Sequence, residues 1–192
     1  MAKQPQQCVI PLHKPSLKEL AFFFASGIVV SIPFAIFFES LVPANYLISP
    51  GLSAAFLVVV LAPFIEELAK VFPLFYRHGE TERSLVTLGL LTGLGFGIAE
   101  FFEYVFFAAA PPIARIPGII FHASSATITA YGIAKNNPLP YYMIAVVLHI
   151  ANNFFAITAD IFSLLGALTV LIIVYLLAWR YYHRASPEKM VV

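Results

Sequence analysis

Two adjacent acids and a lysine interrupt a stretch that is otherwise as apolar as lipid. Glu66 and Glu67 are followed one helical turn later by Lys70, in the segment AAFLVVVLAPFIEELAKVFPLF. An ionised carboxylate at membrane depth is costly unless it is paired or hydrated, so such residues usually mark a functional site. On a helix, Lys70 can pair with Glu66 at i+4 or with Glu67 at i+3. We therefore take these side chains as the first candidates for chemistry.

Other apolar segments of the chain also carry polar side chains. The spacing of His149 and Asn153 places both on one helix face. Because polar faces are unfavourable in contact with lipid, we expect them to meet in one hydrated cavity inside a helical bundle. Positions along the predicted helices put His149 and Glu66 near mid-membrane and Glu100 and His122 nearer the outer surface, which favours a cavity that opens outward. The polar side chains in these segments are Glu100, Glu103, His122, His149, Asn152 and Asn153.

Glutamate, histidine and asparagine suffice for either of two kinds of chemistry. A glutamate can take a proton from an attacking water and return it to a leaving amine, while His122, His149 or Asn153 stabilises the oxyanion of a peptide bond. Glutamate and histidine are also zinc ligands, so Glu66, His122 and His149 are an alternative site for a divalent metal. Our first hypothesis is a mechanism without a cofactor, and a divalent metal at these residues is the alternative.

Several familiar kinds of site are excluded. The chain has no HExxH motif, so a zincin is not expected. Its serines lack a GxSxG or Ser/Lys setting, and its single cysteine, Cys8, lies outside the apolar segments, so covalent catalysis is not expected either. The net charge of +1 gives no basis for binding nucleic acid.

The composition is that of an integral membrane protein. Of 192 residues, 60% are hydrophobic and 11% are charged, against about 45–50% and 25% in soluble domains. The apolar run 20–38 is too long for a signal-peptide core and has no cleavage site, so we interpret it as a retained span. We expect a single membrane domain over residues 1–192, with polar tails at 1–16 and 183–192.

Polar and turn-forming residues divide the chain into about six segments, each near the roughly 20 residues that a membrane helix needs. The sequence thus predicts an all-α fold, a polytopic transmembrane helical bundle. The last break, from Thr158 to Ser163, is inferred from length, because residues 138–182 are too long for one span. Pro63 predicts a bend beside Glu66. The predicted spans are 17–40, 50–76, 84–109, 114–134, 138–158 and 161–182.

Basic residues are distributed unequally between the two sides of the predicted bundle. With the N-terminus inside, only Arg115 falls on the outer side, which is a strong positive-inside signal. Both termini are therefore predicted to be cytoplasmic. The basic residues on the cytoplasmic side are Lys3, Lys14, Lys18, Arg77, Arg83, Lys135, Arg180, Arg184 and Lys189.

Three glycines at four-residue spacing lie on the third predicted span. Gly89, Gly93 and Gly97 form two overlapping GxxxG motifs, which permit close helix contact in lipid. The same letters are not a dinucleotide fingerprint, because no βαβ unit surrounds them. We therefore expect this stripe to pack against another helix.

Four motifs occur in order on separate predicted helices. They are EExxK at Glu66, Glu67 and Lys70, FGIAEFFEY with Glu100, Arg115 ahead of His122, and HxxxN at His149 and Asn153. Together they resemble the PrsW family of intramembrane proteases, which is related to the type II CAAX prenyl endopeptidases of the glutamate intramembrane or Abi group. The resemblance covers residues 63–155. Departures are Ile65 in place of a third acid, Lys70 in place of a CAAX-type arginine one position later, and Gly118 in place of a CAAX-type phenylalanine.

The resemblance implies an intramembrane endopeptidase in which Glu66 activates the attacking water and Glu67 and Lys70 orient or balance it. The residues implied to complete the site and hold the oxyanion are His122, His149 and Asn153. The supporting residues are Lys70, Glu100 and Glu103. Substrates in such families are membrane-associated, anti-sigma factors for PrsW and prenylated tails for the CAAX group. We therefore expect a membrane protein or lipidated peptide as substrate, in a prokaryotic cell membrane, and leave the oligomeric state open.

Two other functions stay open from the residues alone. One is a cation or proton transporter, and the other is a non-catalytic binding or immunity protein on the same scaffold. A protease should hold Glu66 opposite His149 across a water-sized gap, in a cavity that a peptide can enter from the side. A transporter should have two access routes and repeated halves, and the sequence shows no internal repeat.

Overall fold

The computed structural model describes residues 14–43, 49–76, 80–157 and 161–191, and within these ranges the fold is all helical, without a strand. It forms the predicted polytopic bundle. The predicted reversal from Thr158 to Ser163 lies largely outside the described residues. The helices, in chain order, are Leu17–Ser40 (α1, Leu17–Ser26, and α2, Ile32–Ser40), Pro50–Tyr76 (α3, Pro50–Phe56, and α4, Ala62–Val71), α5 (Glu82–Phe107), α6 (Pro112–Ala134), α7 (Pro138–Ala156) and α8 (Ile161–Arg184).

Five of these six helices are long and apolar enough to cross a membrane. The exception is α6, which has 23 residues but a more polar composition. Its polar side chains are buried, because α6 packs against α5, α7 and α8 in the middle of the bundle. A central helix is shielded from lipid by its neighbours and so can carry the polar residues of a site. The buried polar residues of α6 are His122, Ser124, Ser125, Thr127 and Thr129.

Both N-terminal helices contain a π-helical turn just ahead of a proline. The turn Gly27–Ser31 precedes Pro33, and the turn Leu57–Leu61 precedes Pro63. Proline has no N–H and its ring crowds the preceding turn, so the helix must change its hydrogen-bond pattern there. The sequence predicts a bend beside Pro63, and the structure has this widened turn at Leu57–Leu61, just ahead of the α4 segment that carries Glu66.

The glycines of α5 bring two other helices into close contact with it. A Cβ atom added at Gly93 would lie 2.4 Å from the carbonyl oxygen of His122, and one added at Gly89 would lie 2.3 Å from the Cβ of Ala130. These contacts place the expected glycine stripe directly on α6. On another face of α5, a Cβ atom at Gly95 would lie 2.1 Å from the carbonyl oxygen of Phe24 on α1.

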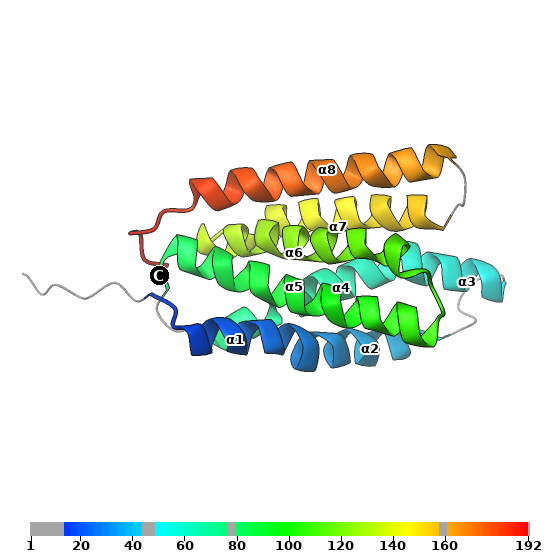
Figure 1. Ribbon diagram of the computed structural model, residues 1–192, viewed down its shortest axis with the longest axis horizontal. Coiled ribbons are helices and arrows are strands. Elements are labelled where there is room, and N and C mark those ends of the chain that lie inside the picture. The colour runs from blue at the N-terminus through cyan, green and yellow to red at the C-terminus, as the bar shows by residue number, and fades with distance from the viewer. Residues whose placement is uncertain (1–13, 44–48, 77–79, 158–160, 192) are drawn as a thin grey trace, which may run out of the picture.

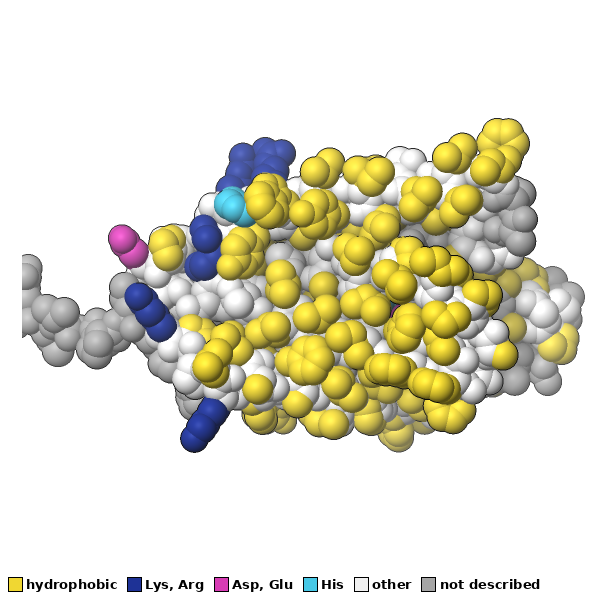
Figure 2. Space-filling view, viewed as in Figure 1, with side chains coloured by type: hydrophobic (Ala, Val, Ile, Leu, Met, Phe, Trp, Pro, Cys, Tyr) yellow, Lys and Arg dark blue, Asp and Glu magenta, His cyan; other side chains and the backbone are white. Residues whose placement is uncertain are grey.

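The outer surface of the bundle is suited to lipid. Figure 2 shows hydrophobic side chains along the whole length of the helices, with Lys and Arg side chains gathered at one end. At that end α1 begins and α8 ends (Figure 1). The protein is therefore a multi-pass membrane protein. The cytoplasmic orientation of this end stays a prediction, and Lys3 and Arg77 lie outside the described residues.

The residues after α8 fold back onto the start of α5. The backbone N–H of Glu82 donates to the carbonyl of Lys189 over 2.9 Å, and that of Ser186 donates to the Glu82 carboxylate over 2.9 Å. Lys135 at the end of α6 donates to the same carboxylate over 2.5 Å. Although the sequence predicts a polar tail at 183–192, the helix continues to Arg184 and the next residues fasten α5 to α6 and α8.

Gly93→Ala should destabilise the bundle, even though alanine is the better helix former. The added methyl group would collide with the backbone of α6, and such overpacking typically costs about 1–3 kcal/mol. The measurement is the midpoint of thermal unfolding in detergent micelles. Gly51→Ala is the matched control, because a Cβ atom there meets nothing within 4 Å. An equal effect of the two substitutions would contradict close packing of α5 on α6.

Candidate functional site

A cavity of about 510 Å³ lies between the helices, toward the end of the bundle at which α6 begins and α7 ends. Residues from α2, α5, α6, α7, α8 and the helix that ends in α4 line it. The polar residues in its wall are Glu39, Glu66, Glu100, Tyr104, Arg115, His122, Asn152 and Asn153. Most of the side chains that the sequence predicts to converge thus lie around one cavity, whereas His149 and Glu103 are not part of its wall.

Behind this wall, Lys70 and Glu67 form an ion pair without access to solvent. The Lys70 ammonium lies 2.7 Å from Glu67 Oε1, and both side chains are 0% exposed. The same ammonium lies 3.9 Å from Glu66 Oε2 and 4.9 Å from the centre of the Phe96 ring. Because an unpaired charge in this position would be very costly, the pair is what allows this face of α4 to be buried.

Glu67 also holds the first of two buried histidines. His149 on α7 donates from Nδ1 to Glu67 Oε1 over 2.9 Å, so Glu67 joins α4 to α7. This hydrogen bond leaves the other ring nitrogen, Nε2, directed toward Glu66, whose Oε2 lies 3.8 Å away. A histidine whose N–H is held by a carboxylate presents a lone pair at its second nitrogen.

A second carboxylate holds His122 in the same way. His122 on α6 donates from Nε2 to Oε2 of Glu100 over 2.5 Å. Its Nδ1 atom is buried and has no hydrogen-bond partner among the described residues. The two imidazole rings lie 5.3 Å apart, at an angle of 77°. Each histidine therefore has one nitrogen fixed by an acid and one left available.

Glu66 is the acid that lies close to both histidines. One ligand atom from each of Glu66, His122 and His149 lies within 4.8 Å of the others. Oε2 of Glu66 is buried without a hydrogen-bond partner, yet the side chain as a whole is 12% exposed, whereas that of Glu67 is 0% exposed. The adjacent acids thus have different environments: Glu67 is enclosed by its partners, and Glu66 reaches the cavity.

Asn153 lies in the cavity wall, where it donates from Nδ2 to the carbonyl oxygen of Val58 over 3.0 Å. In the π-helical turn Leu57–Leu61, the next donor for that carbonyl would be the amide of residue 63, which is a proline. Asn153 therefore supplies the hydrogen bond that Pro63 cannot make. Neither the HxxxN motif that contains Asn153 nor the sequence around Pro63 indicates this hydrogen bond by itself.

The remaining predicted residues lie at the margin of the site. The Arg115 guanidinium lies 3.6 Å from Oε2 of Glu100 and 3.6 Å from the centre of the Tyr104 ring. Glu103 is exposed and borders a smaller cavity of about 80 Å³ together with Glu39. Sequence reasoning missed Glu39, because it follows the first apolar run and resembles an ordinary span boundary, although an acid one residue after that run was a usable signal.

The family comparison matches residues 15–179 to the PrsW family of intramembrane metalloproteases. The chain belongs to this family. No curated protein and no solved structure gives a significant match. PrsW membership confirms the predicted class, an intramembrane protease. The relation to the CAAX prenyl endopeptidases stays a prediction.

Lys70→Met should strongly destabilise this PrsW protein, since it leaves Glu67 buried without its cation. Removing one partner of a buried ion pair typically costs about 3–5 kcal/mol. The double variant Lys70→Met with Glu67→Gln removes both charges and should recover part of the loss, which thermal unfolding of the two variants in micelles would measure. Equal stability of Lys70→Met and the parent would show that the pair does not stabilise the fold.

Proposed function

We propose that the protein is an intramembrane endopeptidase that uses a Glu66-activated water to hydrolyse a peptide bond in a membrane-associated protein. The observation that carries the proposal is the arrangement of Glu66 opposite two histidines, each held by its own acid. PrsW membership gives the class of reaction. A membrane protein or lipidated peptide is the substrate class, and a prokaryotic cell membrane is the proposed location.

The residues present fit a divalent metal such as zinc, which the family description implies. Histidine ligands of zinc commonly donate their other N–H to a carboxylate, and both His122 and His149 do so here. The buried, unpartnered atoms Nδ1 of His122 and Oε2 of Glu66 would gain a partner. We therefore propose Glu66, His122 and His149 as the metal-holding residues and revise our first expectation of no cofactor. When bound, the ion supplies Lewis acidity toward a peptide carbonyl.

Glu66 performs the proton transfers in this proposal. Its carboxylate has two oxygens, so one can face the imidazoles while the other accepts a proton from the attacking water. The same group then returns the proton to the leaving amine. Lys70 and Glu67 act through position: they fix the direction of His149 and lie behind Glu66 without entering the cavity.

The hydrogen bonds of His122, His149 and Asn153 limit what these residues can donate to an oxyanion. With their N–H groups committed to Glu67 and Glu100, neutral His149 and His122 offer lone pairs and no donor to an oxyanion. Asn153 already donates to a backbone carbonyl. These commitments favour the metal over a donor-only oxyanion site.

The cavity offers a route for a peptide from the side. Its wall includes Leu164 and Leu168 of α8 and Ile157 after α7, and all of these are exposed on the bundle surface. A substrate segment lying in the lipid could therefore reach Glu66 between these helices. This access favours the protease over the transporter alternative.

Glu66→Gln should abolish cleavage of single-span substrates reconstituted with the protein, because glutamine cannot accept the proton. Loss of a general acid–base group typically lowers the rate about 10²–10⁴-fold. Cleavage would be followed on gels against Glu188→Gln, the same chemical change at an exposed acid after α8. Equal cleavage by Glu66→Gln and the parent would disprove the role of Glu66.

Metal content tests the cofactor independently of activity. The purified parent should bind about one zinc ion per chain, and His122→Ala or His149→Ala should abolish this binding. Glu100→Gln should weaken it by about 10–100-fold, because it removes the acid that orients His122. Competition with a chelator would measure the affinities. Cleavage that persists in a metal-free parent would support a purely glutamate-based mechanism, whereas zinc binding without cleavage would support a binding protein.

A further inference from the structure

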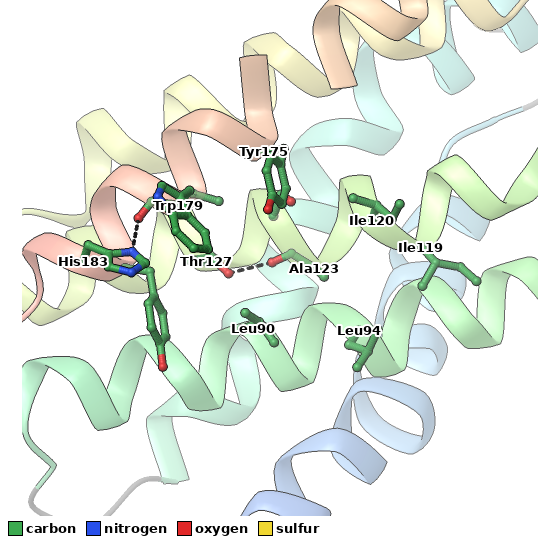
Figure 3. Close-up of a pocket in the computed structure, with 12 residues that line it drawn as sticks. Leu90, Leu94, Ile119, Ile120, Ala123, Thr127, Tyr175, Trp179 and His183 are labelled. Atoms are coloured by element: carbon green, nitrogen blue, oxygen red, sulfur yellow. Dashed lines mark hydrogen bonds between the residues drawn. The ribbon is translucent and has the colours of Figure 1, made fainter. Parts of the chain in front are cut away.

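A second, largely apolar groove lies on the outer face of the bundle, away from the catalytic cavity. It has a volume of about 530 Å³ and is walled by α5, α6 and α8, as Figure 3 shows. Leu90, Ile120 and Ala123 form part of its apolar lining, and Tyr175 and Trp179 stand at its α8 side. No residue of the metal-holding group lines it.

Two of the polar groups in the groove already have hydrogen bonds. The hydroxyl of Thr127 donates to the carbonyl of Ala123 over 2.7 Å, and Nδ1 of His183 lies 2.9 Å from the carbonyl of Trp179 (Figure 3). The His183 ring lies against the Trp179 ring at 4.2 Å between centres. The groove therefore offers an apolar channel rather than a polar ligand site along most of its length.

The lining of the groove favours an apolar occupant. It follows α8 from Tyr175 to His183, a distance of about 12 Å along the helix axis. A hydrocarbon chain suits the apolar lining along this length.

Exposed arginines lie on the last turns of α8, next in sequence to Trp179 and His183, which line the groove. Arg180 and Arg184 have no hydrogen bond or ion pair among the described residues. Arg83, by contrast, lies 4.8 Å from the centre of the Tyr182 ring and donates to the backbone carbonyls of Ala185 and His183 over 3.0 and 3.3 Å. Figure 2 shows Lys, Arg and a histidine beside hydrophobic surface at this end of α8.

We propose that this groove is a binding site for an anionic phospholipid, with one acyl chain along α6 and the phosphate beside Arg180 and Arg184. Positive side chains at the membrane surface attract anionic headgroups, and aromatic rings such as Trp179 suit the interfacial level. The site is separate from the cavity of Glu66, so the proposal does not depend on the protease assignment.

Native mass spectrometry of the full-length protein tests this site with equal amounts of phosphatidylglycerol and phosphatidylcholine. The parent should retain one phosphatidylglycerol in preference to phosphatidylcholine. Arg180→Gln with Arg184→Gln should lower that preference about thirtyfold, since each basic residue at the surface contributes a few-fold or more. Ala123→Phe and Leu90→Trp should each fill the groove and prevent retention of the lipid.

Ala25→Phe is the matched control, because Ala25 is exposed on α1, outside the groove, and the variant should retain the lipid. Thermal unfolding of each variant separates a filled groove from a misfolded bundle. Equal retention of the two lipids by the parent would overturn the proposal. So would retention that neither filling substitution changes, or a dimer of the chain that either filling substitution disrupts.

Discussion

The arrangement of the site depends on the buried contact between Lys70 and Glu67. A charge without solvent is tolerated only with a partner at short range, so the 2.7 Å pair allows this side of α4 to face the interior. Because Glu67 also accepts from His149, the contact that satisfies the lysine sets the position of a histidine on α7. The neighbouring acid, Glu66, then faces the cavity by helix geometry alone, since successive residues point about 100° apart. One acid thus supports the site and the next is available to react.

The bundle brings the other half of the site to α4 through close backbone packing. Glycines on α5 allow α6 to approach so closely that the carbonyl of His122 lies where a side chain at Gly93 would be. This approach sets Glu100 of α5 beside His122 of α6. The helix with the most polar composition can occupy the centre because α5, α7 and α8 shield it from lipid. The close packing that places α6 in the centre is therefore also what keeps its polar residues away from lipid.

The site and the proposed lipid groove occupy different sides of α6. His122 faces the cavity, while Ala123, one residue later, lines the groove. A single helix can serve both because adjacent side chains diverge around its axis. The proposed substrate route and the proposed lipid groove are therefore separate surfaces, and the basic end of α8 lies next to the groove rather than next to Glu66 and Glu67.

The sequence by itself determined the helical class and the limits of the spans, to within about two residues of the described helices. It also indicated which polar residues face the interior, because charged and amide groups are very unfavourable in lipid. It also determined the family through ordered motifs. It did not determine which acid holds which histidine, nor that Asn153 completes the backbone of the turn before Pro63. Glu39 was missed, and the grouping of Glu66, His122 and His149 appeared only as an alternative. Those features depend on contacts between helices distant in the sequence, and on which nitrogen of each imidazole is left free, so only the tertiary structure decided them.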